Sequence, residues 1–228
     1  QDDRHFSFNE VGELSCQIAN ALLATGMPKE TKGAVWATND VTAWTCTLGL
    51  WRANMCWIPV GARNAAEENH YLLDAFDCEV LFFQKYFAAV IAELKPRLPK
   101  VKLWVCIDGA PAEIPDAVTL DNWLTGQPTS KPNVAVELDD VVMLSGTGGT
   151  TGLPKGVMNT HRSAQTFCAH FLMTCTYGGN ERPVNRAAAP MTHTAGLLSL
   201  PATSRGGTVV VVTKPDPALL LGAIPKYK

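Results

Sequence analysis

The sequence predicts an α/β fold in which mostly parallel strands form sheets that helices cover on both faces. Short apolar runs alternate along the chain with segments in which apolar residues recur at helical spacing. The runs are continuously apolar, which is typical of strands buried on both faces of a parallel sheet. The chain has 228 residues, of which 46% are hydrophobic, and this is enough to build a substantial core.

The first 108 residues show this alternation most clearly and are expected to form one α/β region. Ser7 to Glu10 has the S-x-x-E form of a capping box, apolar residues then recur at helical spacing, and Gly26 is the expected stop of this helix. Asn39 or Asp40 caps the next expected helix, which ends near residue 53. Two further helices are expected over 64–75 and up to about residue 94, and the strands are expected at 34–37, 56–60, 80–83 and 101–107.

Residues 109–136 are expected to be a proline-rich connection, interrupted by one apolar patch around Trp123. The remaining residues, 137–228, form a second α/β region around a glycine-rich loop. Its expected strands lie at 141–144, 187–190 and 208–212. Its expected helices lie at 163–174, 194–204 and 216–224, the last of them ended by Pro225.

The composition restricts the classes of function and partner. A formal net charge of −2 does not suggest a nucleic-acid partner, and no apolar run approaches the length of a membrane span. The seven cysteines form no C-x-x-C pair and lie in apolar segments, which is typical of buried thiols in a reducing cytoplasm. We therefore expect a cytoplasmic protein without a cysteine metal site, whose oligomeric state the sequence leaves open.

The run from Met143 to Val157 is the most informative part of the chain. Five glycines and three threonines lie between two short apolar runs, and one lysine follows near the end. Glycines let several backbone N–H groups point into one concavity, threonine hydroxyls add donors, and the lysine adds a positive charge. A polyphosphate is the natural ligand for such a loop.

Two common phosphate-binding patterns do not fit this run. The P-loop pattern G-x-x-x-x-G-K-[ST] fails because Leu153 and Pro154 separate Gly152 from Lys155. The dinucleotide pattern G-x-G-x-x-G fails because Thr151 stands where its third glycine is required. A P-loop kinase or NTPase is therefore disfavoured.

The run resembles T-S-G-[ST]-T-G-x-P-K-G, the phosphate loop of the AMP-forming adenylating enzymes, which include acyl-CoA synthetases, luciferases and peptide-synthetase adenylation domains. Gly148 is the one departure, because the family usually has serine there. The segment from Pro190 to Gly196 also resembles the family's P-[LM]-x-H-x-x-G pattern, and 205–210 resembles its G-G-x-V strand entry. The sequence of the glycine-rich loop and of the residues directly after it looks most like that of bacterial fatty-acyl-CoA ligases.

The resemblance implies a two-step reaction of a carboxylic acid with ATP and then with coenzyme A, with Mg²⁺ bridging the phosphates. It implies that a phosphate-binding set holds ATP: Thr147, Gly148, Gly149, Thr150, Thr151, Gly152 and Lys155. His193 would lie beside the acid's carboxylate as the catalytic histidine, and Gly196 would let the acyl chain pass close to the backbone. His161, which lies a few residues after the glycine-rich loop, is a further candidate for a place near the site.

The family's Y-G-x-T-E segment, its ribose-binding aspartate and the lysine of its mobile C-terminal domain do not occur in these 228 residues. We therefore expect a truncated N-terminal part of an AMP-forming ligase, unable to complete either half-reaction alone. An aryl- or amino-acid-activating relative and a non-catalytic nucleotide-binding module remain as alternatives.

Overall fold

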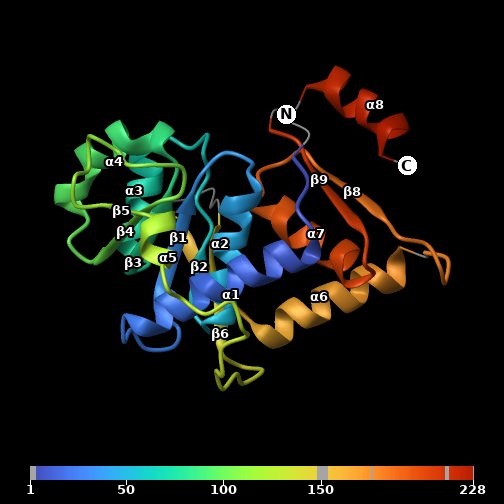
Figure 1. The fold of residues 1–228 in the computed structure, drawn as a ribbon, viewed down its shortest axis with the longest axis horizontal. Helices are drawn as coiled ribbons and strands as arrows, with labels where there is room; N and C mark the ends of the chain where they lie inside the picture. Colours follow the sequence, from blue (N-terminus) through green and yellow to red (C-terminus); the bar gives the residue numbers. More distant parts are fainter. Residues whose placement is uncertain (1–3, 148–153, 176, 214–215, 228) are drawn as a thin grey trace.

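The computed structural model describes residues 4–147, 154–175, 177–213 and 216–227. Its centre is a seven-stranded sheet with the order β5-β4-β3-β1-β2-β6-β7 (Figure 1). All neighbouring strands of this sheet run parallel except β6 and β7, which form an antiparallel pair. The strands are β1 (Lys32–Trp36), β2 (Cys56–Ile58), β3 (Cys78–Phe83), β4 (Leu103–Cys106), β5 (Val118–Thr119), β6 (Val141–Thr147) and β7 (Lys155–Thr160).

Helices cover both faces of this sheet, as the sequence predicts. The helices α1 (Phe8–Ala24), α2 (Val41–Arg52) and α5 (Leu120–Leu124) pack with Trp57 and Phe82 on one face. On the opposite face, α3 (Ala66–Ala75) and α4 (Ala88–Leu94) pack with Ile58 and Phe83. The 3₁₀ turns η1 (Lys85–Phe87) and η2 (Lys95–Arg97) flank α4. The four strands β1 to β4 are almost wholly buried, which explains their uninterrupted apolar sequences.

A second, two-stranded parallel sheet joins β8 (Val184–Ala187) to β9 (Thr208–Val211). Val209, Val211 and α7 (Thr194–Ser204) pack against the core that contains α2, so α2 lies between the two sheets. Helix α6 (His161–Thr174) contacts α7 and β7, and Figure 1 shows α8 (Pro217–Lys226) at the edge of the molecule beyond β8 and β9. The described part of the chain contains no helix long and apolar enough to cross a membrane.

Capping residues define where α1 and α2 begin. Ser7 and Glu10 form the expected capping box, and Gly26, one residue after the cap, has a φ of 75°, where glycine is favoured. Of the two candidates before α2, Asp40 is the cap, because its Oδ1 accepts hydrogen bonds from the N–H groups of Thr42 and Ala43 at 2.7 and 3.1 Å. The Asn39 side chain does not cap α2, and it makes hydrogen bonds to other parts of the chain instead.

The structure differs from the sequence-based expectation at several points. The expected connection over 109–136 contains β5 and α5, two elements too short to give a periodic signal. β7 was not expected as an element of the sheet; its side chains are mostly exposed. α8 continues through Pro225 to Lys226, because a proline in the last turn removes only one hydrogen bond. In addition, β6 and β7 join the sheet of the first 108 residues, so the second expected region contributes to both sheets.

Candidate functional site

The hairpin of β6 and β7 brings the two described ends of the glycine-rich loop together. Thr147 and Lys155 are register partners at its tip, and Thr147 Oγ1 donates a 3.2 Å hydrogen bond to the Lys155 carbonyl oxygen. The other predicted phosphate-binding residues lie outside the described residues: Gly148, Gly149, Thr150, Thr151 and Gly152. The structure therefore fixes the entry and exit of the predicted loop.

Lys155 is exposed at the start of β7. Among the ion pairs of the described residues, none involves its ammonium group. An ammonium group with no carboxylate partner is available to bind an anionic ligand. Lys155 stands two residues after Leu153, where the chain leaves the glycine-rich loop. This position suits the predicted contact with a polyphosphate.

His193 lies just before α7, at its N-cap position, and its side chain is exposed. Its backbone N–H donates to the Pro190 carbonyl oxygen at 3.1 Å, which closes a turn. Its Nδ1 lies 2.7 Å from the hydroxyl oxygen of Thr194. The Nε2 side of the ring has no such neighbour among the hydrogen bonds of the described residues, so it is the side available to a ligand.

Asn39 holds the segment that precedes His193, a role that the sequence did not reveal. Its Nδ2 donates to the carbonyl oxygens of Ala189 and Val212 at 2.9 and 2.8 Å, and its Oδ1 accepts from the Met191 N–H at 2.7 Å. The next residue, Thr192, donates from its hydroxyl to the Val60 carbonyl oxygen at 2.9 Å. The contacts with Val212, Met191 and Val60 are buried, so the two side chains satisfy polar groups there that water does not reach.

These contacts place the predicted residues at one edge of the large sheet. Asn39 follows the carboxyl end of β1, Val60 follows that of β2, and Thr147 ends β6. The three strands are parallel neighbours, so their carboxyl ends meet at the same edge. Open α/β sheets bind their ligands outside this edge. The sheet therefore brings the loop ends and the His193 segment to the same side of the molecule.

Close packing explains why a glycine stands at position 196. A Cβ at this position would lie 2.3 Å from both the Met191 carbonyl oxygen and Cζ3 of Trp44. Trp44 in turn packs edge to face against Trp51 and Trp57. The close approach at Gly196 is thus to a tryptophan of the core, and its predicted contact with an acyl chain stays a prediction.

His161 does not lie with the loop ends. It follows Thr160 at the far end of β7 from Lys155, so it lies away from the loop part of the expected site. Its Nε2 lies 3.2 Å from the Asn54 Oδ1, and Asn54 Nδ2 donates to Asp140 at 2.8 Å. Burial lowers the pKa of His161. Hydrogen bonds from Lys29, Asn54 and the Glu137 N–H hold the pKa of Asp140 well below its usual range.

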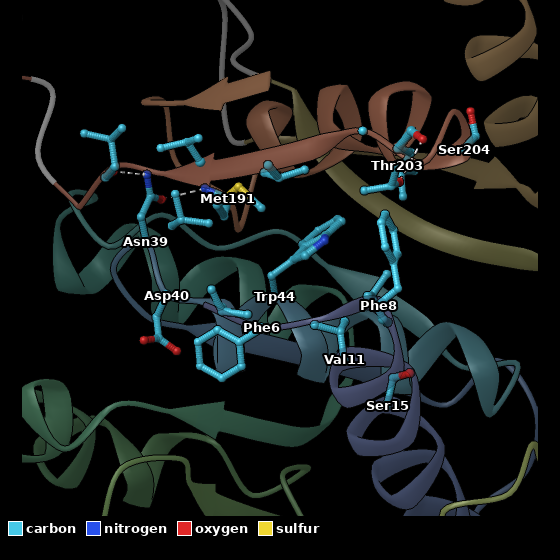
Figure 2. Close-up of a pocket in the computed structure, with 18 of the residues that line it drawn as sticks. Phe6, Phe8, Val11, Ser15, Asn39, Asp40, Trp44, Met191, Thr203 and Ser204 are labelled. Carbon is cyan, nitrogen blue, oxygen red and sulfur yellow. Dashed lines mark hydrogen bonds between the residues drawn. The ribbon is translucent and has the colours of Figure 1, made fainter. Parts of the chain in front are cut away.

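A separate cavity of about 1670 Å³ opens between α1, α2, α6, α7 and β9. Figure 2 shows Trp44 pointing into it, with Phe8 and Val11 of the opening segment on one side and Thr203 and Ser204 on the other. The described residues that line it do not include the loop ends or His193. Asn39 and Met191 line it as well, so the cavity reaches the segment that precedes His193.

Two of the buried cysteines have thiols of low reactivity. Burial raises the pKa of the Cys56 and Cys78 thiols to about 12, so both remain protonated and unreactive at neutral pH. All seven cysteines are free. In the described ranges, no three His, Cys, Asp or Glu side chains gather as metal ligands.

Comparison with known proteins gives a family match and several similar ligases. A family model described as "AMP-binding enzyme" matches residues 1–228. The chain is 28% identical over 221 residues to a feruloyl-CoA synthase of Amycolatopsis sp, covering 96% of this chain and 41% of that protein. It is 30% identical over 247 residues to the medium-chain acyl-CoA ligase Mig of Mycobacterium avium, covering 95% of this chain and 44% of that protein.

The fold is also shared with a solved structure. The anthranilate CoA ligase AuaEII in complex with anthranoyl-AMP superposes with a TM-score of 0.90 at 20% identity, covering all of this chain and 44% of that one. The chain thus spans less than half the length of these relatives. With a family model that matches its whole length, the chain belongs to the AMP-binding enzyme family.

Proposed function

We propose that this chain is the nucleotide-binding part of an AMP-forming acyl-CoA ligase that activates a carboxylic acid, with a fatty acid as the expected substrate. One observation supports this most strongly. Thr147 and Lys155 pair at the ends of the glycine-rich loop, at the sheet edge where the His193 segment is also bound.

The proposed first step forms a bond between a carboxylate oxygen and the α-phosphorus of ATP. The bond from that phosphorus to the β-phosphate bridging oxygen breaks, giving an acyl-adenylate and pyrophosphate. Positioning and charge stabilisation dominate such in-line displacements. The loop's N–H groups, its threonine hydroxyls and Lys155 would hold the β- and γ-phosphates, and His193 would hydrogen-bond the incoming carboxylate.

In the proposed second step, the sulfur of the coenzyme A thiol bonds to the acyl carbonyl carbon and releases its proton to solvent. The bond from that carbon to the phosphate oxygen breaks, and AMP leaves. ATP would enter as its Mg²⁺ complex, in which the ion offsets part of the phosphate charge. We expect the whole protein to act in the cytoplasm, and we expect these 228 residues alone to complete neither step.

An aromatic acid is the second candidate substrate. Two of the similar proteins are a feruloyl-CoA synthase and a 4-hydroxybenzoate/benzoate–CoA ligase, the latter from Rhodopseudomonas palustris. The medium-chain ligase of Mycobacterium avium favours the aliphatic alternative at similar identity. The substrate class therefore requires an experiment.

Acid-dependent ATP–pyrophosphate exchange by the full-length parent protein tests the proposal. A panel of fatty, aryl and amino acids is compared, with Lys155→Ala and Thr151→Ala as loop variants. Exchange with one class of acid, weakened in both variants, is the expected result and names the substrate class. Measurable ATP binding without exchange for any acid would favour a non-catalytic nucleotide-binding module instead.

A further inference from the structure

Helix α3 packs directly on the two strands that enter and leave the glycine-rich loop. A Cβ on Gly146 of β6 would lie 2.7 Å from Cδ2 of Leu72, and one on Gly156 of β7 would lie 3.2 Å from Cε1 of Phe76. Leu72 and Phe76 are buried and lie one helical turn apart. The two glycines thus allow α3 to approach the backbone of the hairpin near its tip.

Tyr71, beside Leu72 on α3, adds a polar contact to the same hairpin. Its hydroxyl donates a 3.1 Å hydrogen bond to the Pro154 carbonyl oxygen. That carbonyl belongs to the peptide group that joins Pro154 to Lys155. Because a peptide group is planar, a hydrogen bond to its oxygen also restrains the orientation of the Lys155 N–H.

The next carbonyl along the chain is bound as well. Thr147 Oγ1 donates to the Lys155 carbonyl oxygen, so both peptide groups that flank the Lys155 Cα accept a side-chain hydrogen bond. The Lys155 ammonium group itself is exposed and, among the described ion pairs, unpaired. The backbone of Lys155 is therefore fixed while its charged end is left available.

We propose that Tyr71 is a positioning residue for ATP binding, which orients Lys155 through the Pro154 carbonyl group. In this proposal Tyr71 touches no phosphate and acts only through the residue after Pro154. The role toward ATP rests on the proposed function, whereas the restraint on the Pro154–Lys155 peptide is a property of the chain without any ligand. The two parts are separately measurable.

The test compares Tyr71→Phe with Tyr86→Phe in the 228-residue chain. Both changes remove one phenol hydroxyl, and Tyr86 is a matched control because its side chain is 83% exposed on η1. Hydrogen exchange of the amides at 155–157 is measured without nucleotide, and the dissociation constant of Mg–ATP is measured by calorimetry. Tyr71→Phe loses one hydrogen bond, so we expect faster hydrogen exchange at these amides and an affinity for Mg–ATP weakened by about fivefold. We expect neither change in Tyr86→Phe.

A double-mutant cycle separates positioning from a general loss of stability. If Tyr71 acts through Lys155, Tyr71→Phe weakens ATP binding in the wild-type background and has no further effect in a Lys155→Ala background. An equal loss in both backgrounds would overturn the proposal. If Tyr71→Phe leaves the hydrogen exchange of the amides at 155–157 unchanged, the proposal is overturned, whatever the affinity for Mg–ATP. Absence of ATP binding by the wild-type chain would contradict the proposed function, and the exchange data would still decide the restraint.

Discussion

Asn39→Ala removes a side chain that joins the ends of both small strands to the His193 segment. The short hydrogen bonds that this change removes are those to the Ala189 carbonyl, the Val212 carbonyl and the Met191 N–H, at 2.9, 2.8 and 2.7 Å. Only 8% of the Asn39 surface is exposed, so water does not replace the lost partners without rearrangement. The change therefore leaves buried polar groups unsatisfied.

The expected loss of stability follows from these contacts. A hydrogen bond contributes about 1 kcal/mol net, and a buried group left without a partner costs about 1–3 kcal/mol. For three short bonds, we expect Asn39→Ala to lower the free energy of unfolding by about 3–5 kcal/mol. Natural domains unfold with about 5–15 kcal/mol, so this loss is a large part of the total.

Urea unfolding followed by circular dichroism measures this loss, with Asn20→Ala as the matched control. Asn20 also donates to two carbonyl oxygens, those of Pro128 and Ser130, but on the exposed side of α1. We expect the control to lose less than about 1 kcal/mol, because water replaces exposed hydrogen bonds. A loss below about 1 kcal/mol for Asn39→Ala as well would refute the reasoning that Asn39 holds the His193 segment.

Two further predictions concern packing and charge. Gly196→Ala would place a Cβ against Trp44 and the Met191 carbonyl, so we expect a loss of about 1–3 kcal/mol in urea unfolding and altered tryptophan fluorescence, while Gly12→Ala, which meets open space, loses no stability. Equal stability of the two variants would contradict the packing account. Because the pKa of Asp140 is lowered, its contribution to stability is present above the ordinary aspartate pKa of about 4 and declines as the pH falls toward the lowered value. Urea unfolding from pH 6 to pH 3 would show this decline in the wild type and a smaller one in Asp140→Asn; identical profiles would oppose it.

The sequence predicts much of this fold because its signals are local. The strands β1 to β4 are buried on both faces, so each appears as an uninterrupted apolar run. The capping box before α1 is read from four consecutive residues. By contrast, β7 lies at the edge of the sheet with exposed side chains, so its pairing with β6 leaves no apolar pattern.

The site is predicted only where its residues lie in one motif. Thr147 and Lys155 were found because they belong to the same glycine-rich run, whereas Tyr71 hydrogen-bonds a residue 83 positions away and Asn39 one that is 152 positions away. Asn39 and Asp40 are equally good caps by type, and only the three-dimensional fold assigns them different partners. Contacts of this kind arise from tertiary structure and leave no spacing in the sequence.

The most direct test of the central claim is the affinity of the 228-residue chain for Mg–ATP before and after removal of the loop lysine. Lys131→Ala is the matched control, because it removes the same charge from an exposed position in 109–136. A charge-assisted hydrogen bond contributes about 1.5–3 kcal/mol, so Lys155→Ala is predicted to weaken binding by about 10- to 100-fold. Binding by Lys155→Ala that equals that of the wild type and of Lys131→Ala would contradict the account.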